Sequence, residues 1–267
     1  MLWATSLLAV LAAGFGQNGH SEAVLARNAL ESTKARLLAD AGAHAALFDL
    51  LRADAAGEPL TIAEQHFALG DGEVRLVISD EDGKIDLNAV PADLLARLLA
   101  GLGVDPPAAA RLADRIVEHR PYHRVEGLTD VSGMGEDLVT KLRPLVTVYS
   151  GLETVAPEAA SAPVLSALPG SNADLAAELR EQGLDSKALV ALPDDMRAGI
   201  EDHLLSSRAL VFGIETLGRS AGAAIYVRRA VVALEPSDRD RPFTIYGWDQ
   251  GDPAGFAFAV AAHDTPP

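Results

Sequence analysis

The chain has no cysteine among its 267 residues. A disulfide framework, a thiolate metal site and a cysteine nucleophile are therefore excluded. Basic residues are also scarce, with 22 Lys and Arg against 38 Asp and Glu, which gives a net charge of −16. This charge disfavours non-specific binding to nucleic acid and adhesion to anionic lipid. Aromatic residues make up only 5% of the chain, but apolar residues reach 49%, and the length is sufficient for two domains with their own cores.

Motifs of common enzyme classes are missing as well. The sequence contains no Gly-x-Ser-x-Gly elbow, no phosphate-binding loop and no dinucleotide fingerprint. Glu118, His119 and His123 form a compact group, but Pro121 breaks the helix between the two histidines, which favours an exposed helix end over a zinc site. We therefore expect a protein that is not an enzyme and has no catalytic residues.

The start of the chain is apolar. Residues 2–15 carry no charge, but this run is shorter than the ~20 residues that cross a bilayer as a helix. Three interpretations are open: a membrane anchor whose first turns precede Met1, a secretory signal, or a buried core helix. Because helical spacing continues to about residue 52, a single helix would be ~75 Å long, and its first half must leave the folded domain. This length favours the anchor.

Strand and helix signals divide the rest of the chain. A hairpin is expected over residues 61–69 and 73–79, around Gly70-Asp71-Gly72. Strand signals then stop, and helical signals fill residues 88–206 before strands return at residues 209–217, 223–234 and 243–248. This order predicts an α+β fold in which a long N-terminal helix packs on an antiparallel sheet, with an all-helical domain inserted into the sheet.

The junction between sheet and helical block has a distinctive sequence. Residues 83–88 read Gly-Lys-Ile-Asp-Leu-Asn, and we expect Asn88 to cap the helix that follows. Residues 125–151 include Val-Ser-Gly-Met-Gly-Glu-Asp-Leu and Leu-Val-Thr-Val-Tyr-Ser-Gly. Together with the apolar start and a closing strand ending at Trp248, these segments give the chain its resemblance to the minor pseudopilin K of bacterial type II secretion systems, over nearly its whole length.

The resemblance implies a domain plan. It consists of a membrane-anchor helix (1–20), a first pseudopilin segment (21–87), an inserted helix-hairpin-helix or SAM-like domain (88–206), a second pseudopilin segment (207–250) and a tail (251–267). It also implies a location: a single pass in the inner membrane, with the soluble domains in the periplasm. The K subunits typically lack the glutamate near the start of the mature helix, and here no acidic residue precedes Glu22.

The resemblance further implies a function in protein secretion and transport. Such a subunit sits at the tip of the periplasmic pseudopilus with other minor pseudopilins, of the I and J type, and initiates or caps its assembly. We expect the N-terminal helix to bind these partners through leucines on or near one face: Leu25, Leu30, Leu37 and Leu38.

A DNA-binding function is the alternative. Residues 125–145 have the layout of a helix-hairpin-helix, whose turn approaches a phosphate in DNA-binding versions. Here Glu136 and Asp137 follow the turn, and residues 86–205 carry 19 acidic against 10 basic residues. A membrane-tethered DNA-binding protein is therefore the second hypothesis, and a packing role for the motif, without nucleic acid, is preferred.

Two acidic groups raise the question of calcium. Asp80, Asp82 and Asp86 have the alternation of a calcium loop, but Ala92 stands near the position of the required glutamate, which favours a solvated turn. Four further carboxylates lie beside the last strand, and the resemblance implies a calcium site in the strand-containing part. We expect that site at Asp238, Asp240, Asp249 and Asp252.

Overall fold

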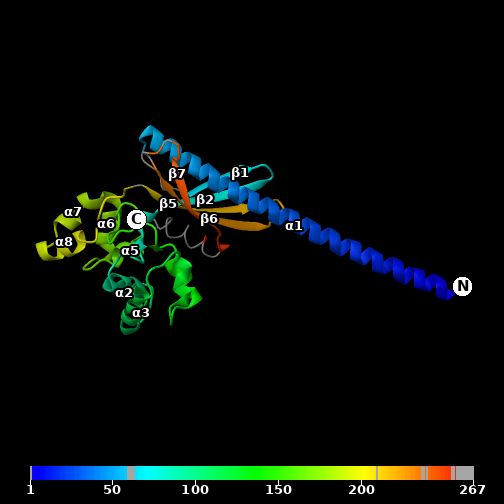
Figure 1. Cartoon of the computed structure of the whole chain (residues 1–267), viewed down its shortest axis with the longest axis horizontal. Helices are drawn as coiled ribbons and strands as arrows, with labels where there is room; N and C mark the ends of the chain where they lie inside the picture. Colours follow the sequence, from blue (N-terminus) through cyan, green and yellow to red (C-terminus); the bar gives the residue numbers. More distant parts are fainter. Residues whose placement is uncertain are drawn as a thin grey trace.

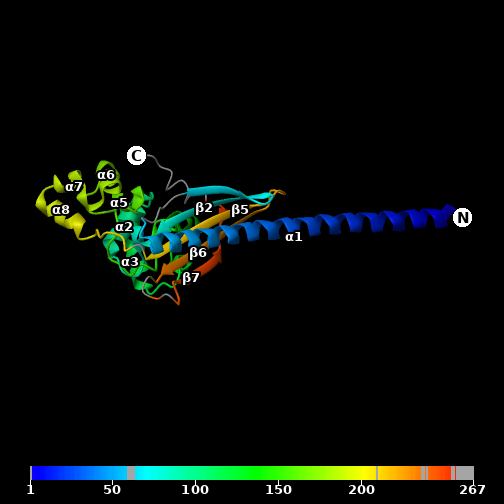
Figure 2. The same cartoon turned by 90° about the horizontal axis from the view of Figure 1, so that it is seen from above.

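A computed structural model describes residues 2–58, 64–208, 210–235, 238, 240–253 and 256. Helix α1 (Leu2–Ala56) has 55 residues and spans ~80 Å at 1.5 Å per residue. Its C-terminal half lies on the sheet, whereas its N-terminal half projects alone from the rest of the molecule (Figures 1 and 2). The expected continuous helix is confirmed. Within the described part of the chain, no helix contains an apolar stretch long enough to cross a membrane.

One antiparallel sheet of five strands forms the body beneath α1. Its order is β1-β2-β5-β6-β7, so strands separated by a long stretch of sequence are neighbours. The strands are β1 (Glu64–Leu69), β2 (Gly72–Asp80), β5 (Val211–Arg219), β6 (Ile225–Leu234) and β7 (Phe243–Gln250). Ile78 lies opposite Ile214 and Asp80 opposite Phe212, so β2 and β5 pair up to the point where the chain leaves the sheet.

The segment between β2 and β5 is a mostly helical lobe, which lies at the end of the sheet away from the N-terminus (Figure 1). A short parallel pair, β3 (Ile85–Asp86) with β4 (Val146–Thr147), ties its two ends together. The helices α2–α8 and three 3₁₀ turns make up the rest: η1 (Glu81–Gly83), α2 (Ala92–Gly101), α3 (Pro106–Glu118), η2 (Val125–Asp130), α4 (Glu136–Leu142), α5 (Ala162–Ser166), α6 (Ala173–Gln182), η3 (Gly183–Asp185), α7 (Lys187–Val190) and α8 (Asp194–Glu201).

The lobe and the sheet have separate apolar cores. One large cluster of buried residues lies wholly between Ile85 and Leu204. A second contains Leu47 of α1 with Leu76, Phe212 and Val232 of the sheet. The predicted α+β fold with an inserted helical unit is therefore confirmed. The domain limits stay a prediction, and residue 209, where the first returning strand was expected to begin, lies outside the described residues.

Two local expectations at the junction are corrected. Asn88 does not cap α2: its amide Nδ2 donates to the Tyr122 carbonyl, its Oδ1 accepts from the Tyr122 N–H, and Pro91 takes the N-cap position. The turn at Asp80, Asp82 and Asp86 is not solvated, because all three residues are buried. The carboxylates of this segment accept hydrogen bonds from other groups of the chain inside the fold.

Candidate functional site

The projecting part of α1 is the first candidate surface. Residues 22–30 are exposed all round the helix, and Leu25, Leu30 and Leu37 are each more than half exposed. At 100° per residue, Leu30 and Leu37 lie about 20° apart, but Leu25 lies about 140° from Leu30. The four leucines therefore do not share one face, and only Leu30 and Leu37 of the exposed three are aligned.

Leu38 belongs to the interior. It is 8% exposed, and it lies so close to the sheet that a Cβ at Gly72 would stand 2.4 Å from its Cδ1. Its expected role in partner binding is therefore wrong, because its side chain already packs within the chain.

Buried carboxylates join the two crossings between sheet and lobe. Asp82 accepts hydrogen bonds from Arg208 at three donors, the backbone N–H at 2.9 Å, Nε at 3.1 Å and Nη2 at 2.9 Å. Arg208 Nη2 also donates to the Ser150 carbonyl at 2.8 Å. Asp86 accepts from the Ser150 hydroxyl and from the Gly151 N–H. These bonds fix where the chain leaves the sheet relative to where it returns.

Gly83 is required at the same junction. A Cβ on this residue would stand 2.4 Å from the carbonyl oxygen of Ala159. The Gly-Lys-Ile-Asp-Leu-Asn sequence therefore has a structural role. Gly83 allows the backbone to approach Ala159 closely, and Asp86 accepts hydrogen bonds from Ser150 and Gly151 of the lobe.

Asp80 makes this junction sensitive to pH. Burial raises its pKa to about 6, although Ser207 and the Asp82 N–H donate to its carboxylate. Because the folded-state pKa lies above the unfolded value near 4, the folded protein binds the proton more tightly. Stability from this group is therefore full below about pH 4 and is lost as the pH rises through 6.

We expect Asp80→Asn to remove the part of the pH dependence of stability that comes from this carboxyl. The amide oxygen still accepts from the Asp82 N–H, and the NH₂ group can donate to Ser207. Chemical denaturation of both proteins at pH 4, 5, 6 and 7 measures the free energy of unfolding. From pH 4 to pH 7, the value for the variant should rise by about 2–3 kcal/mol relative to that for wild type. An equal difference at every pH would contradict the raised pKa.

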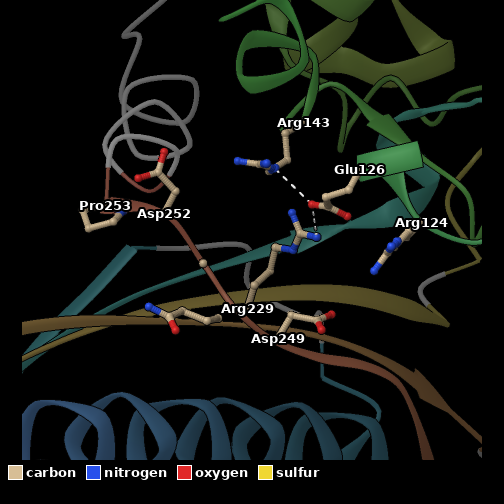
Figure 3. A pocket seen from close by; sticks show the side chains of 9 residues that line it. Arg124, Glu126, Arg143, Arg229, Asp249, Asp252 and Pro253 are labelled. Carbon is tan, nitrogen blue, oxygen red and sulfur yellow. Dashed lines mark hydrogen bonds and ion pairs between the residues drawn. The ribbon is translucent and has the colours of Figure 1, made fainter. Parts of the chain in front are cut away.

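A polar pocket of about 530 Å³ lies between the lobe and the far end of β7 (Figure 3). Glu126 of η2 pairs with Arg229 of β6 at 2.6 Å and with Arg143 at 3.3 Å. Burial alone would raise the pKa of Glu126, but the two arginines outweigh it and the pKa is lowered. Glu126 therefore acts as an ionic link between the lobe and the sheet in the lining of this pocket.

The four expected calcium ligands do not come together. Asp249 and Asp252 line the pocket at the C-terminal end of β7. Asp238 and Asp240 precede the strand, and seven residue steps of β7 span about 23 Å. Asp238 is turned inward to its own loop, where Oδ1 accepts from the N–H groups of Asp240 and Arg241.

Asp249 and Asp252, the two expected ligands that lie at one pocket, fit a calcium ion poorly. Calcium takes six to eight oxygen ligands. The part of the chain that the structure describes contains no group of three or more acidic or histidine side chains placed to hold a metal. Arg124, Arg143 and Arg229 line the same pocket as Asp249 and Asp252. Calcium binding remains a prediction of the sequence.

The helix-hairpin-helix is present in the lobe. Gly133 adopts a φ of +91°, which lets the chain turn between η2 and α4, and Glu136 and Asp137 occupy the first turn of α4. A Cβ at Gly133 would stand 3.0 Å from Arg115 Nη2, so the arginine already occupies the space beside the turn. The ring of His119, at the end of α3, is tilted against that of Tyr122, with 6.1 Å between ring centroids. The motif packs inside the lobe in this arrangement.

Sequence reasoning missed three arginines that pair with acidic side chains of other elements. Arg208, Arg228 and Arg229 bind Asp82, Asp40 and Glu126 respectively. One signal could have found two of them: neighbouring residues of a strand point to opposite faces, so adjacent arginines in an otherwise apolar β6 must each reach a partner on its own side. Nothing local could have indicated Arg208.

Comparisons with known proteins agree with this geometry. Residues 80–147 match a family model described as a helix-hairpin-helix motif. No curated protein matches the chain. Among solved structures, the chain is similar to one chain of the GspK-GspI-GspJ complex of the enterotoxigenic Escherichia coli type 2 secretion system, with a TM-score of 0.65 and 16% identity. The match covers 85% of this chain and 99% of that one. The resemblance predicted from the sequence is confirmed at the level of fold.

Proposed function

We propose that this chain is a minor pseudopilin of K type, a non-enzymatic subunit at the tip of a type II secretion pseudopilus. The observation that carries the proposal is the extent of the fold match, which covers 85% of a chain made of a long helix, a sheet and an inserted lobe, and 99% of the other chain. A pilin-type helix and sheet alone would support only a general pilin-like role. The inserted lobe is what favours the K type.

The shape supports a subunit that caps the assembly. The projecting half of α1 and the helical lobe lie at opposite ends of the sheet (Figure 1). A neighbour could pack along the helix, but the lobe blocks stacking beyond the sheet. We propose that the N-terminal segment anchors the chain in the inner membrane, with sheet and lobe in the periplasm, and that I-type and J-type pseudopilins are its partners.

Charge substitutions on the aligned leucines test the proposal. Leu30→Asp and Leu37→Asp should each reduce co-purification with pilin-like subunits of the same organism at least ten-fold, because a buried leucine contributes ~1.5–3 kcal/mol and a buried unpaired charge adds a further cost. Leu184→Asp is the matched control, since Leu184 is exposed in the helical lobe. If both α1 variants still associate with pilin-like subunits as the wild type does, the face of α1 that carries Leu30 and Leu37 does not bind the partner.

DNA binding is retained as the second candidate because a helix-hairpin-helix model matches residues 80–147. Acidic residues after the turn disfavour contact with phosphate. Electrophoretic mobility of duplex DNA with the full chain at low salt separates the two hypotheses. We expect no shift, and a shift that weakens steeply with salt would support DNA binding.

Calcium binding is carried forward as a separate proposal at the β7 end of the pocket, where Asp249 and Asp252 are the remaining candidates. If the ion binds there, calcium at a hundred times its dissociation constant should add ~2.7 kcal/mol of stability. Thermal melts with calcium and with chelator measure this difference. Identical melting curves with calcium and with chelator would contradict calcium binding by these two carboxylates.

A further inference from the structure

Arg229 of β6 lies among three carboxylates and forms its ion pair with the most distant of them in sequence. In the sheet register, Arg229 stands opposite Glu215 of β5 on one side and opposite Asp249 of β7 on the other. Residues directly opposite each other in an antiparallel pair have Cβ atoms about 4.5–5.5 Å apart on the same face, so both acids are within reach of Arg229. Arg229 Nη2 instead binds Glu126 Oε1 of the lobe at 2.6 Å (Figure 3). The arginine therefore joins the sheet to the lobe rather than strand to strand.

Glu215 is the carboxyl left without this cation. Its side chain is partly buried, whereas Asp249 is exposed and can be solvated. Burial raises the pKa of Glu215, and this effect outweighs the neighbouring cations, which lower it. Within the described part of the chain, no ion pair or hydrogen bond to the Glu215 carboxyl forms. A protonated Glu215 is compatible with this position, but an ionised one needs a cation.

Charged and titratable groups from both the sheet and the lobe surround Glu215. They line a common cavity of about 40 Å³ with it and comprise Glu81, Lys84, Arg143, Tyr149 and Arg229. Two of the three cations are engaged by groups of the lobe itself. Lys84 Nζ binds Glu81 Oε1 at 2.6 Å, and Arg143 Nε lies 3.3 Å from Glu126 Oε1.

Arg229 is the cation whose partner can change. It stands directly opposite Glu215, and it lines both the small cavity beside Glu215 and the polar pocket of about 530 Å³ on the other side. A cavity of this size exceeds the space that one water needs, so the side chains here are not close-packed. The guanidinium of Arg229 therefore has room to turn from Glu126 to Glu215 while its backbone stays in the sheet.

We propose that Arg229 changes its partner with pH and so controls the docking of the lobe on the sheet. When Glu215 holds a proton, Arg229 binds Glu126 and the lobe is docked. When Glu215 ionises, Arg229 turns to it, and Glu126 keeps only Arg143, which belongs to the lobe as well. Because the docked arrangement binds the proton of Glu215 more tightly, docking is complete at low pH and is lost as the pH rises through the pKa of Glu215. Every group involved belongs to this chain, so the switch operates whether or not the proposed function is correct.

The distance between lobe and sheet tests the switch. The chain has no cysteine, so nitroxide labels attached to Ser132→Cys in the lobe and Leu69→Cys on β1 are unique, and both native residues are exposed. Double electron–electron resonance on the full chain should give one narrow distance distribution at pH 5 and a second, broader population at pH 8. Glu215→Gln should keep the narrow distribution at pH 8, because a neutral amide does not attract the arginine. Glu126→Gln should show the broad population at both pH values.

Glu64→Gln is the matched control. Glu64 pairs with Arg75 between β1 and β2, so its loss removes an acid–arginine pair that lies within the sheet, and the variant should respond to pH as the labelled parent does. A distance distribution that is the same at both pH values in the parent would overturn the proposal. So would a response that persists in Glu215→Gln, which would assign the effect to Asp80, whose pKa is also raised by burial.

Proton binding by Glu215 gives a second test, which does not depend on movement of the lobe. The carboxyl carbon of Glu215 is identified in carbon-13 NMR spectra by its absence from Glu215→Gln, and its shift is followed against pH. In Glu126→Gln, Arg229 is released to Glu215, so the pKa of Glu215 should fall and its proton affinity should decrease by about ten-fold or more. An unchanged proton affinity in Glu126→Gln would contradict the exchange of partners.

Discussion

Gly218→Ala is expected to separate α1 from the sheet. A Cβ at this position of β5 would stand 2.2 Å from the carbonyl oxygen of Ala35 and 2.5 Å from the N of Ala39. Both are backbone atoms of α1, so no side chain can rotate away and the whole helix must shift. The shift would also break the bond from Thr216 Oγ1 to the Ala39 carbonyl, now 2.7 Å long. We expect a loss of about 3 kcal/mol in the free energy of unfolding.

Denaturation followed by tryptophan fluorescence measures this loss. Trp248 contacts His44 of α1 and so reports on the helix–sheet contact, whereas Trp3 is exposed far along α1. Gly199→Ala is the matched control, because Gly199 lies within α8 and nothing stands within 4 Å of its added Cβ. That variant should gain up to about 1 kcal/mol from helix propensity. Equal effects of the two substitutions would contradict the close packing of α1 on β5.

The elements of the fold were predictable because each has its own periodic pattern. Helices α2 to α8 all lie within the helical block expected at residues 88–206, and β7 begins at Phe243, where the last strand was expected to begin. The return of strand signals after the helical block predicted one antiparallel sheet with a helical insertion, but the order of its strands, with β2 beside β5, became known only from the structure.

The functional surfaces were less predictable, because they depend on partners far apart in sequence. Asp82 and Arg208 are separated by 126 residues, so nothing local distinguishes this buried aspartate from a solvated turn. Leu37 and Leu38 are neighbours of one residue type, but one faces solvent and the other the sheet. Which side of α1 is buried depends on where the sheet docks, and the weak amphipathic pattern of so long a helix does not fix it.

Arg228→Ala is the second substitution with a large expected effect. Its side chain is 5% exposed, and Nε donates to Asp40 Oδ1 at 2.6 Å. Its guanidinium also lies 5.2 Å from the ring centroids of both Tyr226 and Trp248. Truncation leaves Asp40 without this partner and removes the stacking, so we expect a loss of about 3–5 kcal/mol in the free energy of unfolding.

The control is a substitution of Arg36, an exposed arginine that contacts the same Asp40 carboxylate. The Arg36 side chain is 61% exposed and its Nε lies 3.8 Å from Asp40 Oδ2, so Arg36→Ala should cost less than about 1 kcal/mol. A double variant, Arg228→Met with Asp40→Leu, removes both charges together and should recover much of the loss, since an apolar pair of similar size needs no partner. Recovery would attribute the cost of Arg228→Ala to the Asp40 carboxylate, which loses its buried partner and keeps only the exposed Arg36. A double variant as unstable as the single one would instead attribute it to the lost contacts with Tyr226 and Trp248. Either result identifies the interaction that holds the C-terminal half of α1 on the sheet.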